Sequence, residues 1–244
     1  MNTIKSSERG NVLFLILIAV ALFAALSYAV TQSSRSGRGD ASSETAAVNA
    51  ATITQYPTGI RTAVLRMTIS GLTLDRIEFN EPDDFGTCTT PPGGDTAAAC
   101  VFHPNGGGAT YQLAPASAMA TGVNEPWYFN ANFKPDGVGL DANPEYMAFL
   151  PNITQNLCLE INRRYNIPGT PTIPTLAATA GSIEQTLGGG TGYVATNGTG
   201  TGDVAAVAQA VAWPAALDSQ AYGCFQNTTP DPDEYVYYHT IVEQ

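Results

Sequence analysis

The side chains best suited to chemistry in this sequence are four cysteines, Cys88, Cys100, Cys158 and Cys224. No two of them form a CxxC pair, and the two histidines of the chain lie far apart, so the ligand spacing of a zinc site is absent. An even number of cysteines behind an apolar N-terminal segment favours two disulfides in an oxidising compartment. More than one connectivity is open from sequence alone. We expect the local pair Cys88–Cys100, which leaves Cys158–Cys224.

The histidines, His103 and His239, have no recognisable partner for nucleophilic catalysis. No GxSxG or similar signature accompanies them, so we expect both to be structural. The glycine-rich residues 188–202 superficially resemble a phosphate-binding loop, but no Lys-Ser or Lys-Thr pair follows, which excludes a Walker motif. The sequence therefore predicts no catalytic residue, no cofactor and no enzymatic activity.

Two acidic clusters, residues 81–85 and 231–235, offer carboxylate oxygens of the kind that Ca²⁺ binds. Neither has the ligand spacing of an EF-hand loop, so we interpret both as solvated turns and predict no metal site, with Ca²⁺ at these clusters as the alternative. The net charge of −11 leaves no basic patch that would neutralise phosphates. We therefore expect no nucleic acid as a partner.

Residues Val12–Val30 form an apolar run in which Ser27 is the one polar member and no residue is charged. As an α-helix this run is about 28 Å long, close to the hydrocarbon thickness of a bilayer. Signal peptidase could remove it by cleaving after Ala29. It could instead stay as a simple anchor, with Lys5 and Arg9 in the cytoplasm. A third fate is retention as the helix through which subunits pack into a filament.

The leader MNTIKSSERG, residues 1–10, is short, polar and charged, ends in glycine and directly precedes the apolar run. This arrangement resembles the class III signal of type IV prepilins and of the pseudopilins of type II secretion. The resemblance implies that a prepilin peptidase cleaves between Gly10 and Asn11 and methylates Asn11. It also implies that the apolar helix holds the subunit in the inner membrane and later packs against other pilin-like subunits in a filament core.

Two positions depart from the usual pattern of that family. Asn11 stands where Phe or Met is usual, and Leu15 stands where a glutamate is usual at the fifth mature position. Some minor pseudopilins at filament tips also lack this glutamate, so the resemblance implies a minor subunit. The residues expected to face lipid before assembly and neighbouring subunits afterwards are Val12, Phe14, Leu15, Leu17, Val20, Leu22, Phe23 and Leu26.

Helical periodicity resumes after the apolar run. The Ser- and Gly-rich residues 33–44 predict a linker, and apolar residues from Ala46 to Met67 recur at helical spacing, which predicts an amphipathic helix. Pro57 predicts a kink or a break in it, and Gly71 a C-cap. The predicted organisation is a leader at 1–10, a transmembrane and assembly helix at 11–32, a linker and amphipathic helix at 33–71, and an extracytoplasmic β-rich domain at 72–244.

Strand-like alternation replaces the helical pattern after residue 72. Strands are predicted at 72–80, 126–133, 145–150 and 233–242, with a hairpin at 99–114 around a glycine turn. Asn152 is the expected N-cap of a helix at 153–166, and residues 166–203 are expected to be loop. The predicted fold class is α+β, with the long N-terminal helix packed on an antiparallel sheet and long Gly/Pro-rich loops.

The function expected from these features is that of a structural subunit, and a minor one, of a type IV pilus or type II secretion-like filament. The subunit would lie in the bacterial inner membrane with its domain outside the cytoplasm, and after assembly in a periplasmic or cell-surface filament. The alternative is an anchored or secreted periplasmic or surface domain that binds a glycan or a protein, as an adhesin does. The fate of the leader discriminates between them, because only a pilin needs Gly10 before the cleavage site.

Overall fold

The computed structural model of this chain describes residues 9–88, 96–139, 144–178, 183–184, 186–187, 213–229 and 233–243; within the first helix, the side chains of 9–11 and 32–43 are not described. The chain divides into two compact units, Met1–Thr45 and Ala46–Gln244. Residues 46–71 thus belong to the same unit as the globular part. The other domain boundaries that the sequence predicts stay predictions.

The first helix, α1, comprises Arg9–Ile69 and includes residues 33–44. The sequence predicts a kink or a break at Pro57; Pro57 lies inside the helix, so the break does not occur, and the kink stays a prediction. An interior proline costs about 3 kcal/mol, which packing on both sides of it must offset. Pro57 is itself buried, and it continues the buried stripe of Ile53 and Ile60.

The end of α1 is the predicted glycine cap. Gly71 has a φ of 97°, which favours glycine, and its N–H donates to the carbonyl of Thr68 at 3.0 Å. The N–H of Leu72 donates to the carbonyl of Met67 at 3.2 Å. These bonds satisfy carbonyl groups that the end of a helix would otherwise leave unpaired.

The second unit contains a five-stranded sheet with the order β1-β2-β5-β4-β3. Its strands are β1 (Tyr128–Asn130), β2 (Tyr146–Leu150), β3 (Thr175–Leu176), β4 (Tyr222–Asn227) and β5 (Glu234–Val242). The predicted strands at 126–133, 145–150 and 233–242 contain β1, β2 and β5, whereas β3 and β4 were not predicted. Because β3 pairs with β4 in parallel, the sheet is mixed and the prediction of an antiparallel sheet is wrong in that detail.

Two further strand predictions are wrong. Residues 72–80 form a short 3-10 helix and a single bridge between Glu78 and Cys100, and residues 99–114 form turns in place of a hairpin. The glycine run explains the second difference. A Cβ atom on Gly106 or Gly107 would collide with the carbonyl oxygen of Cys100 or Val101, so the glycines let this backbone fold closely onto itself. The 3-10 helices are Leu74–Arg76, Pro82–Thr87, Thr96–Ala99, Ala116–Ala118 and Ala215–Leu217.

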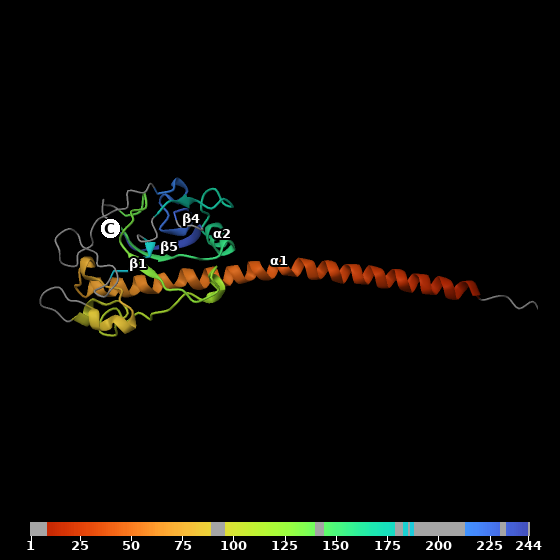
Figure 1. Cartoon of the computed structure of the whole chain (residues 1–244), viewed down its shortest axis with the longest axis horizontal. Helices are drawn as coiled ribbons and strands as arrows, with labels where there is room; N and C mark the ends of the chain where they lie inside the picture. Colours follow the sequence, from red (N-terminus) through yellow and green to blue (C-terminus); the bar gives the residue numbers. More distant parts are fainter. Residues whose placement is uncertain are drawn as a thin grey trace, which may run out of the picture. The chain divides into compact units, whose positions relative to one another are not determined.

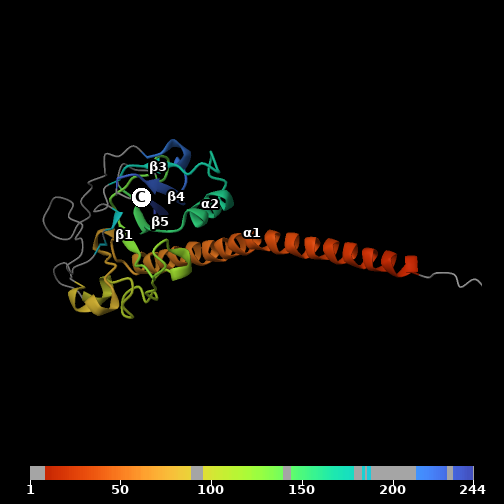
Figure 2. The same ribbon diagram turned by 45° about the vertical axis from the view of Figure 1, so that its right-hand side comes forward.

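Both faces of the sheet are buried. Along β2, Ala148 and Leu150 belong to one core cluster, while Met147 and Phe149 belong to a second cluster on the other face. The first cluster also contains the buried stripe of α1 and residues of α2 (Gln155–Arg164). Figures 1 and 2 show α2 and the sheet on one side of residues 46–69 of α1, and the yellow segment around Pro82–Thr87 on the other. The fold class is α+β.

The helix α2 begins differently from the prediction. Its N-cap is Thr154, whose Oγ1 accepts the N–H of Leu157 at 3.4 Å, and not Asn152, which has a φ of 60° in the preceding turn. Near the C-terminal end of α2, Asn162 Nδ2 donates to the carbonyl of Cys224 in β4, and Asn162 Oδ1 accepts the N–H of Cys224, both at 2.9 Å. This buried side chain therefore joins the helix to the sheet.

The structure has disulfides at Cys88–Cys100 and Cys158–Cys224, which are the two pairs that the sequence predicts. The first closes a separation of 12 residues and the second one of 66 residues, from α2 to β4.

Removing the longer-range disulfide should destabilise the second unit more than removing the local one. The chain-entropy model gives about 4 kcal/mol for Cys158→Ala/Cys224→Ala and about 3 kcal/mol for Cys88→Ala/Cys100→Ala. Urea unfolding of the full-length protein in mild detergent measures both, because Trp127 and Trp213 are buried and report on the core by fluorescence. A larger loss for the Cys88/Cys100 variant would contradict the expected order.

Candidate functional site

The most exposed apolar surface among the described residues is the segment Val12–Thr31 of α1. It comprises 20 residues, none of them buried. Exposure extends around the helix, from Leu13 at 69% to Phe23 at 72% and Leu26 at 64%. By length and composition this helix can cross a membrane, and a signal sequence has the same properties.

All eight residues predicted to face lipid or neighbouring subunits lie in this segment and are exposed. Leu15 is 59% exposed and Leu17 64%. Covering apolar surface of this kind is favourable by about 25 cal/mol for each Å² removed from water, and large exposed apolar patches mark interaction sites. The segment contains no Asp, Glu, Lys or Arg. The exposed residues are Val12, Phe14, Leu15, Leu17, Val20, Leu22, Phe23 and Leu26.

The expected cleavage site lies at the start of the same helix. Gly10 and Asn11 follow Arg9, where α1 begins, and their side chains are outside the described set. Residues 1–8 of the leader are outside the described residues altogether. The cleavage between Gly10 and Asn11 therefore stays a prediction.

His239 is a buried core residue of β5. Its Nδ1 lies 2.8 Å from the Tyr237 hydroxyl, and its ring stacks on Tyr222 with a centroid distance of 5.3 Å. Burial, with a smaller contribution from the positive charge of Arg61, lowers the pKa of His239 to about 4. The imidazole is therefore neutral at pH 7, and it packs against aromatic rings.

His103 lies in the turn that follows Cys100. Its Nδ1 accepts the N–H of Asn105 at 3.1 Å, and its ring packs edge-on against Phe85 at 4.8 Å. These contacts orient the ring within the turn.

The acidic clusters are only partly described. In the first, Glu81 accepts the Tyr111 hydroxyl at 2.7 Å. In the second, Asp233 accepts the Gln226 amide at 2.7 Å and Glu234 accepts the Asn227 amide at 2.9 Å, while Asp231 lies outside the described residues. These carboxylate oxygens accept hydrogen bonds from side chains of the protein, and calcium binding at the clusters stays an alternative prediction. The glycine-rich residues 188–202 also lie outside the described residues.

Among the described residues, one group of metal-ligand types comes together: Glu78, Cys88 and Cys100, whose ligand atoms all lie within 4.8 Å of one another. Both sulfurs are committed to the disulfide, which leaves no thiolate for a metal in this form. Sequence reasoning missed Glu78, because its proximity depends on the bridge that pairs it with Cys100.

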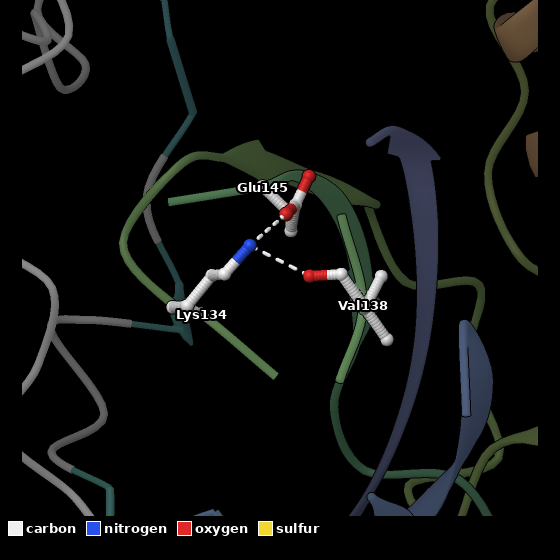
Figure 3. A network of polar contacts seen from close by, with 3 residues as sticks. All are labelled: Lys134, Val138 and Glu145. Atoms are coloured by element: carbon white, nitrogen blue, oxygen red, sulfur yellow. Dashed lines mark hydrogen bonds and ion pairs between the residues drawn. The ribbon is translucent and has the colours of Figure 1, made fainter. Parts of the chain in front are cut away.

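A buried ion pair was also missed (Figure 3). Lys134 Nζ donates to Glu145 Oε1 at 2.5 Å and to the carbonyl of Val138 at 2.6 Å, and the Glu145 side chain is fully buried. The pair joins the two ends of the connection between β1 and β2. The two opposite charges compensate each other, so the ion pair holds the ends of this connection together.

Two shallow grooves lie beside α1. One has a volume of about 380 Å³ and is lined by Thr52, Gln55, Tyr56, Gly59, Ile60, Ala109, Thr110 and Gln112. The other has about 350 Å³ and is lined by Arg66, Met67, Ser70, Gly71, Leu72, Ala98, Asn105 and Gly106. Among the described residues, neither lining contains a His, a Cys or a carboxylate; the polar side chains there include Tyr56 in the first groove and Arg66 and Ser70 in the second.

Comparison of the chain with protein-family models, with curated proteins and with solved structures finds no match. The physical properties of the described residues therefore carry the choice of function, and the apolar segment of α1 is the candidate site.

The neutral state of His239 should make stability depend on pH. Its pKa is lower in the folded protein (about 4) than the usual value of about 6.5, so its contribution is fully present above pH 6.5 and is lost as pH falls toward 4. When the pH falls from 7 to 5, the free energy of unfolding should decrease by about 2 kcal/mol more in wild-type protein than in His239→Gln, because glutamine does not titrate. Urea unfolding at the two pH values measures this difference, and equal losses in the two proteins would refute it.

Proposed function

We propose that this chain is a pilin-like structural subunit, a minor one, of a type IV pilus or type II secretion-like filament. The observation that carries the proposal is the two-part character of α1. Its segment Val12–Thr31 is exposed on every side, whereas its residues after Ala46 contribute a buried stripe to the globular core. A helix of this kind supplies an assembly segment and a structural element of the domain in one piece.

The physical basis of assembly is an exchange of neighbours. A helix without charges is stable in lipid, and replacing lipid by the apolar helices of other subunits costs little, because both surroundings are apolar. The segment would hold the subunit in the inner membrane first and pack between other pilin-like subunits afterwards. The disulfides support a domain outside the cytoplasm, where thiols are oxidised.

Leu15 supports the assignment as a minor subunit. A glutamate at this position would need a positively charged partner inside the filament, because an unpaired carboxylate in an apolar core is costly. With Leu15 the segment contributes no such charge, so it neither needs nor supplies that pairing. This property fits a subunit that is present in few copies better than a subunit that repeats along the filament shaft.

Processing would begin at the leader. A prepilin peptidase would cleave after Gly10, and the mature protein would start at Asn11 with one added methyl group. The alternative function, an anchored or secreted binding domain of adhesin type, requires no cleavage at Gly10.

Gly10→Val should block processing, since the branched side chain replaces the glycine that precedes the cleaved bond. Intact mass and N-terminal sequencing of protein from native membranes should show wild type starting at methylated Asn11 and the variant retaining residues 1–10. Gly59→Val is the matched control, because it places the same change in α1 where a Cβ atom meets nothing within 4 Å. It should be processed normally.

The mature N-terminus also distinguishes the alternatives. A wild-type chain starting at Met1 would identify a simple anchor, and one starting at Val30 would identify a cleaved signal sequence. Either result would overturn the proposed function.

Leu17→Lys should abolish incorporation into filaments. A lysine in an apolar membrane helix costs up to about 3 kcal/mol, the value at the helix centre, and in a filament core it would lie without a counter-charge. The amount of subunit in sheared filaments should fall at least about ten-fold, since that factor requires only about 1.4 kcal/mol per subunit. Immunoblotting of the filament and membrane fractions measures it.

Val123→Lys is the control for this change, because Val123 is a comparably exposed apolar residue (56%) of the second unit. It should leave incorporation unchanged, and both variants should retain wild-type thermal unfolding. Normal filaments containing Leu17→Lys would contradict an assembly role for the segment.

A further inference from the structure

The disulfide Cys88–Cys100 has a carboxylate beside it. Glu78 Oε2 lies 3.9 Å from Cys100 Sγ, and the ligand atoms of Glu78, Cys88 and Cys100 all lie within 4.8 Å of one another. Two sulfurs and one carboxylate oxygen are a ligand set that Zn²⁺ accepts. The other disulfide differs, because no such third ligand lies within reach of Cys158 and Cys224 in the described part of the chain.

Backbone hydrogen bonds hold Glu78 beside Cys100 without any contribution from the disulfide. The N–H of Glu78 donates to the carbonyl of Ala99 at 3.0 Å, and the N–H of Val101 donates to the carbonyl of Glu78 at 2.9 Å. The carbonyl of Cys100 accepts the N–H of Gly107 at 3.0 Å. Cys88 has a local bond, from its N–H to the carbonyl of Phe85 at 3.2 Å.

The carboxylate is also oriented. Asn80 Nδ2 donates to Glu78 Oε2 at 3.3 Å, as groups behind a metal ligand commonly do. In a tetrahedral zinc site, bond lengths of about 2.3 Å to sulfur and about 2.1 Å to oxygen place these atoms about 3.6 Å apart. The observed 3.9 Å between Glu78 Oε2 and Cys100 Sγ is close to that separation.

We propose that Glu78, Cys88 and Cys100 form a zinc site in the dithiol state of the protein. Reduction opens the S–S bond, and two electrons from a thiol or phosphine reductant, with two protons from water, convert it into two thiols. On binding Zn²⁺ each thiol releases one proton, so two thiolates and the Glu78 carboxylate coordinate the ion, with water as the fourth ligand. Two electrons must leave the thiolates and the ion must dissociate before the disulfide can form again. This inference is independent of the filament role.

The test uses the full-length protein in detergent. It is reduced with a phosphine, which takes up the oxygen of one water molecule as the disulfide becomes two thiols, and is then freed of reductant under inert gas. Titration with Zn²⁺ against a chromogenic chelator should give one tight site in reduced protein and none in oxidised protein. Co²⁺ should give the charge-transfer absorption of a two-thiolate site.

The decisive variant is Glu78→Gln, which keeps the shape of the side chain and removes its charge. It should weaken zinc affinity at least about ten-fold, as expected for a lost metal contact. Glu81→Gln is the matched control, since Glu81 bears the same carboxylate three residues away and lies outside the ligand group. It should bind zinc as wild type does.

Alkylation of the thiols locates the ion even if reduction loosens the fold. Zn²⁺ should slow the alkylation of Cys88 and Cys100 at least about ten-fold, in proportion to occupancy of the site, and leave Cys158 and Cys224 unchanged, as read by peptide mass spectrometry. Equal protection of all four cysteines, no protection, or equal affinity in Glu78→Gln and wild type would overturn the proposal.

Discussion

The second unit depends on the burial of one face of α1 against the sheet. Ile53, Ile60 and Val64 are each at most 1% exposed, and they share a core with residues of β2, β5 and α2. This packing holds the helix through Pro57, where local propensity alone would interrupt it. Because the helix contributes a buried stripe to the core, removal of residues 46–69 would expose the apolar residues that pack against it.

Polar groups inside this unit are paired where the fold brings them together. Asn162 satisfies both backbone groups of Cys224, and Lys134 compensates the buried charge of Glu145. Such pairs contribute less to net stability than apolar burial does, but leaving one partner alone costs several kcal/mol, about 3–5 for a buried charge. They therefore fix which helix lies beside which strand and how the connection between β1 and β2 is closed.

The segment Val12–Thr31 differs from the later part of α1, because its apolar side chains are exposed. In the described part of its own unit nothing covers it, and it has no charged residue that would keep it in water. Lipid and the apolar helices of other subunits both provide apolar surroundings, as the proposed function requires. His239 is neutral among aromatic rings, and His103 is bound within a turn.

The sequence by itself determined the apolar segment, the amphipathic stripe that ends before Gly71 and the strands β1, β2 and β5, and it favoured the two disulfide pairs among the open connectivities. These features follow from local periodicity, from glycine's access to positive φ, and from the short separation of Cys88 and Cys100. The sequence did not reveal β4, because Tyr222–Asn227 is buried through contacts on both faces and lacks a clear alternation. The parallel pairing of β3, the Thr154 cap, the Asn162 bridge and the position of Glu78 beside Cys100 were decided only by the tertiary structure. Each of them depends on which distant backbone groups meet, and a linear pattern carries no information about that.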